Sequence, residues 1–248
     1  MKWLKLVRGE LRKLTTTSMP WAFVAVLVVI AAINAAAIIW GTDADGSKAF
    51  ISTAEDQLSL LAFGANAMLI TGLFGAIAVS REYGHGTVVP TFLTTPRRTR
   101  AVLAQLTAVF VGGGVLGLVG AGLILVTGAI SIPAVDYEFM LSAGTVTRIL
   151  AAAVLAGGLG AVLGAGIGAL VRNTGGAVVG AVLVLLILPP LAVQLASGAA
   201  FWIPGTLVSV LSGVVDDPGL PAALLALAAW SLVPAVIGLA AVQKRDVV

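Results

Sequence analysis

Six apolar segments without charged side chains constrain this chain more than any other feature. They cover approximately residues 21–40, 58–80, 101–130, 149–171, 174–197 and 222–242. A helix needs about 20 apolar residues to cross a hydrocarbon core of about 30 Å, and every segment reaches that length without an Asp, Glu, Lys, Arg or His. Strands of a membrane barrel would alternate polar and apolar residues over about 10 positions, and these segments do not. The sequence therefore predicts an all-α, polytopic membrane protein, a single domain over residues 1–248.

Composition agrees with a membrane environment. Hydrophobic residues make up 59% of the chain and charged residues 10%, with a mean hydropathy of +1.10, so water could not solvate its surface. The net charge is +3, but the basic residues lie at the ends of apolar segments, where they meet lipid headgroups. We therefore expect membrane lipid, and no nucleic acid, as a partner. The absence of cysteine excludes disulfides and cysteine catalysis, and the lone His85 predicts neither a metal nor a catalytic site.

Charge is distributed unequally between the two sides of the predicted bundle. Basic residues cluster before the first span, between spans two and three, between spans four and five, and in the tail. The opposite connections carry mostly Asp and Glu, with Lys48 and Arg148 as exceptions. By the positive-inside rule both termini are cytoplasmic, and we expect a multi-pass protein of the cell inner (plasma) membrane. The third segment reaches about 45 Å as a helix and must tilt or project into the cytoplasm.

The N-terminal segment predicts an amphipathic interfacial helix over residues 2–14. Its apolar residues recur at helical spacing while Lys and Arg take the other faces. These apolar residues are Trp3, Leu4, Val7, Leu11 and Leu14. The alternative is a generic positive flank that only orients the first span.

Residues 81–98, between spans two and three, form the most informative polar segment. Gly84 and Gly86 permit turns, and Thr87 begins a predicted short helix that ends before Pro96. Such a helix would present Val88, Phe92 and Leu93 beside Arg97 and Arg98, which suits docking into a groove of another protein. The alternative is a solvated loop.

The pattern Arg81-Glu82-x-Gly84-x-Gly86-Thr87, followed by Leu93-x-x-Pro96-x-Arg98, resembles the cytosolic loop of type-two ATP-binding-cassette (ABC) exporter permeases. That loop typically reads Glu-x-x-x-Gly-Thr, a hydrophobic stretch, then Pro with Arg. The opening Glu10-Leu11-x-Lys13-Leu14 is also similar to the family, as are the span number and the length. Gln105 departs from the family pattern, which has a lysine soon after the Pro-Arg group.

The resemblance implies that residues 87–95 form a coupling helix fitting a partner ATPase, and that residues 2–14 form the connecting helix. The implied ATPase-coupling residues are Arg81, Glu82, Gly84, Gly86, Thr87, Val88, Phe92, Leu93, Pro96, Arg97 and Arg98. For Glu82 the alternative role is a local ion pair with a nearby Arg. The chain has no Gly-x-x-x-x-Gly-Lys-Ser/Thr motif. ATP and Mg are therefore expected on a separate ATPase subunit, in two copies, beside a second permease copy or a related permease.

Between spans five and six, residues 201–211 are too apolar for an ordinary loop and too short for two crossings. They favour two re-entrant half-helices, and the resemblance implies that these cap the outer end of the pathway, with Trp202, Pro204 and Gly205 as outer gate candidates. Alternatively, Trp202 is an interfacial anchor. Glycines spaced four apart, such as Gly160 and Gly164, predict close helix packing. Pro189-Pro190 and Pro234 predict kinks or breaks in spans five and six.

The resulting hypothesis is the permease subunit of an ABC exporter that moves hydrophobic or amphiphilic cargo, such as a drug, antibiotic, lipid or hydrophobic peptide. The chain itself would not be an enzyme. An ion-coupled secondary transporter or channel is the alternative, although its usual ionisable residues within the spans are absent from the sequence. An intramembrane enzyme would need a nucleophile, an acid–base pair or a metal cluster, and the sequence offers none. The Ala, Gly and Val bias is typical of a high-GC bacterium.

Overall fold

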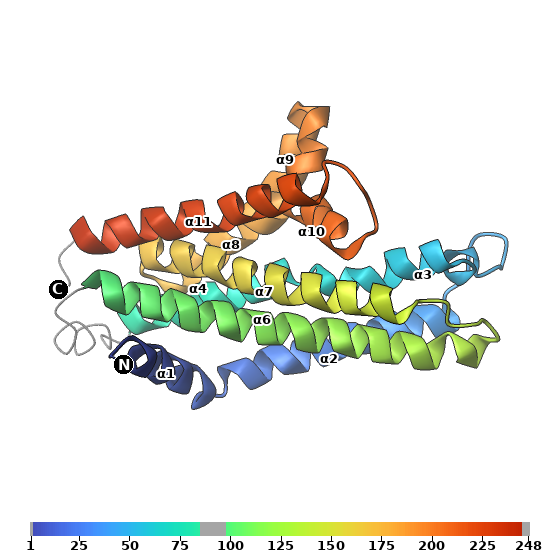
Figure 1. The fold of residues 1–248 in the computed structure, drawn as a ribbon, viewed down its shortest axis with the longest axis horizontal. Coiled ribbons are helices and arrows are strands. Elements are labelled where there is room, and N and C mark those ends of the chain that lie inside the picture. Colours follow the sequence, from blue (N-terminus) through green and yellow to red (C-terminus); the bar gives the residue numbers. More distant parts are fainter. Residues whose placement is uncertain (1, 85–97, 245–248) are drawn as a thin grey trace.

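The computed structural model describes residues 2–84 and 98–244, and within these ranges the chain is helical, with no strand (Figure 1). The α-helices are α1 (Lys2–Thr15), α2 (Met19–Trp40), α3 (Ala54–Leu61), α4 (Met68–Gly84), α6 (Arg98–Ser131), α7 (Ala143–Val171), α8 (Thr174–Val182), α9 (Leu188–Leu195), α10 (Pro204–Ser212) and α11 (Leu220–Lys244). The shorter elements are η1 (Ala49–Ile51), η2 (Ala62–Ala65), η3 (Pro133–Val135), η4 (Leu183–Ile187), which is a π-helix, and η5 (Ser197–Trp202).

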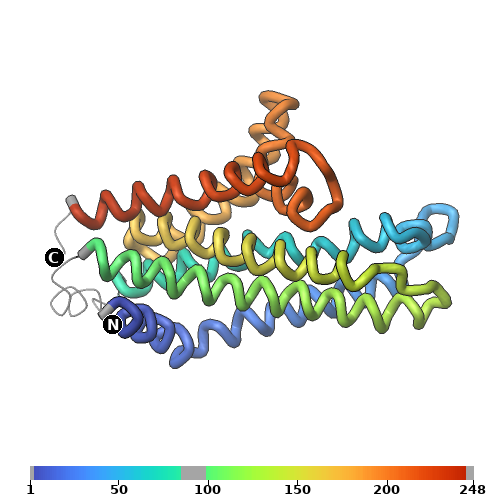
Figure 2. Tube along the Cα trace, viewed as in Figure 1, coloured from blue at the N-terminus to red at the C-terminus, as the bar shows by residue number. Residues whose placement is uncertain are grey.

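Six helical stretches are long and apolar enough to cross a membrane, which confirms the predicted all-α fold and span number. They are Met19–Trp40, Ala54–Gly84, Thr99–Val135, Ala143–Val171, Thr174–Leu195 and Leu220–Gln243. The bundle is elongated, and α1, the start of α6 and the end of α11 lie at one end of it (Figure 2). The connections from α2 to α3 and from α6 to α7 lie at the other end (Figure 1). As predicted, the third span contains a long helix, since α6 has 34 residues.

Helix α7 is the centre of the bundle and packs against α4, α6 and α11. Its glycines make this packing close: a Cβ added at Gly164 would overlap the carbonyl of Gly72 in α4. On another face, a Cβ at Gly157 would lie 3.1 Å from the Cα of Gly117 in α6. The predicted packing role of these glycines within one chain is thereby confirmed, since small residues let helix backbones approach in a membrane.

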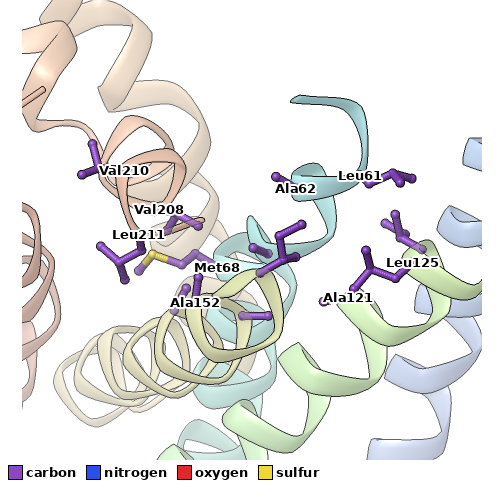
Figure 3. Packing of buried hydrophobic residues seen from close by; sticks show 14 of the residues in the cluster. Leu61, Ala62, Met68, Ala121, Leu125, Ala152, Val208, Val210 and Leu211 are labelled. Atoms are coloured by element: carbon purple, nitrogen blue, oxygen red, sulfur yellow. The ribbon is translucent and has the colours of Figure 1, made fainter. Parts of the chain in front are cut away.

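Buried apolar side chains form one cluster that includes α10 and another, around Phe74, against which Leu14 of α1 packs. Figure 3 shows Val208 and Leu211 of α10 beside Met68 and Ala152, so α10 is part of the packed bundle. By contrast, the outer faces of α2 and α9 expose large apolar side chains, including Trp21 at 72% and Leu195 at 89%. Apolar residues on all faces of a helix suit a lipid environment.

Two predicted spans deviate from straight helices. The second is interrupted: α3 is followed by η2, Asn66 has φ −82° and ψ 40°, and α4 starts at Met68. In the fifth, the π-helix η4 precedes Pro189 and Pro190, which lack the N–H groups that a regular helix needs. Helix α9 consequently leaves the direction of α8 (Figure 1), as the prolines predicted. Helix α11 continues through Pro234 without a break.

The two basic residues that departed from the charge pattern both cap helix ends. The Lys48 ammonium donates hydrogen bonds to the carbonyls of Ile38, Ile39 and Gly41 at the end of α2, at 2.7–2.9 Å. The Arg148 guanidinium donates from Nε to the Leu211 carbonyl and from Nη2 to the Val210 carbonyl, both at 2.9 Å, at the end of α10. Cations stabilise the carbonyl ends of helices, so both exceptions serve local structure.

Candidate functional site

The motif that carried the resemblance lies between α4 and α6. Arg81, Glu82 and Gly84 form the last turn of α4, and α6 begins at Arg98. The remaining predicted coupling residues lie outside the described residues: Gly86, Thr87, Val88, Phe92, Leu93, Pro96 and Arg97. The structure thus describes the two helix ends that flank residues 85–97, the end of α4 and the start of α6, which we call the base of this connection.

A polar cluster joins this base to α1 and α6. We call Glu10, Lys13, Glu82 and Gln105 the loop-base cluster. The Lys13 ammonium lies 2.8 Å from Oε1 of Glu10 and 3.3 Å from Oε1 of Glu82, and the Gln105 side chain hydrogen-bonds Glu82. The Glu10 and Glu82 side chains are only 12% and 16% exposed, and that of Lys13 is 43% exposed. The cluster therefore ties the ends of three helices together.

Lys13 holds its charge firmly in this setting. Burial alone would lower the pKa of Lys13, but the hydrogen bond to Glu10 and the charges of Glu82 and Glu10 outweigh it and raise the pKa above the ordinary value of 10.5. Lys13 is thus a permanent cation at neutral pH. Gln105, which stands where the resemblance implied a lysine, hydrogen-bonds the Glu82 carboxylate through its neutral amide. Among the contacts of the described residues, Lys13 of α1 supplies a cation to Glu82.

A second set of contacts ties the same end of α4 to the rest of the bundle. The Arg172 guanidinium lies 5.2 Å from the centre of the Tyr83 ring, a cation–π contact, and its Nη2 donates to the Ala241 carbonyl at 3.4 Å. The Ser80 hydroxyl donates to Oγ1 of Thr174 at 3.4 Å. A displacement of the last turn of α4 would therefore reach α7, α8 and α11 as well as α1.

The predicted apolar face of α1 is partly buried against the protein and partly exposed. Val7, Leu11 and Leu14 are partly buried, and α1 packs against α6. Trp3 and Leu4 are exposed, Leu4 at 73%. The exposed part is available to a membrane surface.

Two hollows border these elements. The first, of about 440 Å³, lies between the α1–α2 corner and α4, beside the loop-base cluster. The second is an apolar groove of about 540 Å³ between the α8–α9 region and α11. Its lining is Val184, Leu188, Trp202, Ala226, Ala229, Trp230, Val233 and Pro234.

The outer gate candidates lie beside the interrupted second span. The Trp202 carbonyl accepts a hydrogen bond from Nε1 of Trp230 at 2.8 Å, and Trp202 is 48% exposed. Pro204 is buried at the start of α10. Gly205 lies against Asn66, because an added Cβ there would be 3.3 Å from the Asn66 amide nitrogen. The three candidates are close in sequence, and the structure adds the contact of Trp202 with α11 and that of Gly205 with Asn66.

Sequence reasoning missed the partner of Glu82. The spacing of Glu10 and Lys13, three residues apart on a helix, indicates a local pair. Nothing in the sequence links either residue to Glu82, 69 positions beyond Lys13. The interpretation of Glu82 as a member of a local ion pair anticipated an arginine, and the structure pairs Glu82 with Lys13.

Within residues 2–84 and 98–244 no three His, Asp or Glu side chains are grouped closely enough to hold a metal ion. Comparison of the chain with protein-family models gives no match, and comparison with curated proteins gives no significant match either.

Proposed function

We propose that this chain is the membrane-spanning permease subunit of an ABC exporter, resembling the type-two permeases, and that a separate ATPase drives it. The observation that carries the proposal is the motif around Glu82, located between spans two and three, on a base that is joined to α1 and α6 through Lys13 and Gln105. Residues 87–95 would form the coupling helix and α1 the connecting helix on the membrane surface. ATP and Mg would bind to the partner.

The contacts around the base support a mechanical role for it. A force on residues 85–97 would act on the last turn of α4. From there Lys13 carries it to α1, and Arg172 carries it to the ends of α7 and α11. Because α4 packs along α7 with little space between the backbones, the two helices would move as a unit. This unit would switch between inward-open and outward-open states.

Orientation and assembly follow from charge and exposure. By the positive-inside rule, the basic end of the bundle would face the cytoplasm of an inner (plasma) membrane. This end contains α1 and the end of α11. Only 17% of the most apolar windows of α2 and of the α8–α9 span are buried within the chain. These faces are available to lipid and to a second permease copy, or a related permease, across a central pathway.

The apolar lining of the groove beside Trp230 supports hydrophobic or amphiphilic cargo, such as a drug, antibiotic, lipid or hydrophobic peptide. The hairpin made by η5 and α10 would be the re-entrant outer segment. In that arrangement Trp202, Pro204 and Gly205 lie where the pathway would close.

The test is affinity purification of the tagged chain with its native neighbours in mild detergent, followed by mass spectrometry. We expect an ATPase subunit with the wild-type chain and a marked loss with the Glu82→Ala, Phe92→Ala double variant. A matched control removes the same residue types at the opposite end, Glu55→Ala with Phe63→Ala, and should retain the ATPase. A wild-type chain that never recovers an ATPase would refute the proposal.

One observation favours the alternative, an ion-coupled secondary transporter. Interrupted helices often form the binding sites of such transporters, and the second span is interrupted at Asn66. Uptake into vesicles containing the purified chain alone, driven by a proton or sodium gradient, would support this alternative. Transport that requires an added ATPase would eliminate it.

A further inference from the structure

The hollow between α1, α2 and α4, which we call the α1–α4 cavity, is lined by both apolar and polar side chains. Its volume is about 440 Å³. Three apolar side chains, Leu14, Met19 and Ala78, contribute to the lining together with hydroxyl and charged side chains. The polar members are Lys13, Thr16, Thr17, Arg81 and Glu82. A lining of this kind suits a molecule with a polar head and an apolar body.

The position of the cavity along the spans matches the level of lipid headgroups. Met19 is the first residue of α2, and Arg81 directly follows the apolar stretch of α4. Trp21 at 72% and Trp3 at 40% are exposed on the elements that form this corner, and tryptophan is enriched at the membrane–water interface. In a bilayer the cavity would therefore open where headgroups meet acyl chains.

Charge favours an anionic head. Arg81 is exposed and lines the cavity. Lys13 lines it as well, but Glu10 and Glu82 already balance its charge, so Arg81 and the exposed cations of α1 carry the argument for an anionic head. Helix α1 exposes three further cations nearby in sequence, Lys5, Arg8 and Arg12. Basic pockets between spanning helices bind anionic lipid headgroups, and each Lys or Arg near the surface strengthens this attraction.

We propose that the α1–α4 cavity binds one anionic phospholipid of the surrounding leaflet. Arg81 contacts the headgroup phosphate, and the apolar side chains of the lining receive the upper acyl chains. The lipid then touches α1, α2 and α4 at once, beside the loop-base cluster. This inference goes beyond the proposed function and does not rest on it, because the site is complete in a single chain.

The test is native mass spectrometry of the purified full-length chain in detergent, titrated separately with phosphatidylglycerol and phosphatidylcholine. We expect one phosphatidylglycerol to be retained in preference to phosphatidylcholine. Arg81→Gln should weaken its retention about fivefold, as expected for one surface cation. Ala78→Phe should abolish retention by filling the cavity. Arg100→Gln is the matched control, because Arg100 is an exposed arginine at the same end that does not line the cavity.

The outcomes separate the proposal from its rivals. Equal retention of the two lipids, or an Arg100→Gln effect as large as that of Arg81→Gln, would overturn the site in favour of general surface charge. Retention that survives Ala78→Phe would place the lipid elsewhere. Displacement of phosphatidylglycerol by millimolar inorganic phosphate would show that the cavity binds a free anion, which would overturn the lipid site. Monodisperse elution and unchanged helical circular dichroism of each variant establish that it is folded.

Discussion

Replacement of Gly164 by alanine tests the close packing of α4 against α7. The added Cβ would overlap the Gly72 carbonyl oxygen, and it would lie 2.7 Å from the Gly72 carbonyl carbon and 2.9 Å from the Ala76 nitrogen. All of these are backbone atoms, so no side chain can turn aside and the helices must separate. Overpacking of this kind costs about 1–3 kcal/mol, and a rigid backbone contact favours the upper end. Alanine returns about 1 kcal/mol through its greater helix propensity, which leaves a net loss of about 2 kcal/mol.

The assay is thermal unfolding of the purified chain in detergent, in which the loss of monodisperse protein is measured as the temperature rises. For a chain of this size about 2 kcal/mol corresponds to a fall in Tm of about 4–8 °C. Gly122→Ala is the matched control in α6, because its added Cβ would meet nothing within 4 Å, and its Tm should stay the same or rise. A Gly164→Ala protein that melts at or above the wild-type temperature would refute the backbone contact between α4 and α7.

Three further predictions concern polar contacts. The raised pKa of Lys13 means that its ammonium is still mostly charged at pH 10.5, so on the basic side its pairs with Glu10 and Glu82 weaken only as the pH rises beyond that value. Lys13→Met removes both pairs and should loosen α1 at neutral pH, by about 1 kcal/mol or less given solvent screening. The distance between spin labels on cysteines introduced into α1 and α4 reports this, and an unchanged distance in the variant would contradict it. Gln57→Leu removes a fully buried amide that donates to the carbonyls of residues 51 and 138 and accepts from the N–H of residue 140. The unfolding free energy should therefore fall by roughly 1–3 kcal/mol for each group left unpaired. A loss below about 1 kcal/mol in a denaturant titration would argue against these bonds. Arg148→Gln should unwind the last turn of α10, since two carbonyls lose a charged donor. The rate of hydrogen exchange at residues 204–213 should then rise. Protection equal to that of the wild type would show that the cap is dispensable.

The site was predictable from the sequence only in part. Arg81, Glu82 and Gly84 were placed correctly at the junction of the second span and its polar connection, because a change from apolar to polar residues marks a span end directly. The pairing of Glu82 with Lys13 was not predictable, because the first two spans and the connection between them separate the two residues in the sequence. Two helices must first pack before such a pair can form. The pairing of Gln105 with Glu82 is of the same kind, and it explains how a neutral residue is accommodated at that position.

The sequence by itself determined the membrane class, the six spans and the common end of α1 and α11. Each of these follows from local rules: about 20 apolar residues cross a bilayer, and every crossing reverses the direction of the chain. Tertiary structure decided the rest. It made α7 the central helix, placed α10 in the core (Figure 3) and used Lys48 and Arg148 as helix caps. Lipid solvates every apolar face equally well, so hydrophobicity cannot select neighbours, and helix partners are chosen by close backbone contact at glycines and by hydrogen bonds between distant residues.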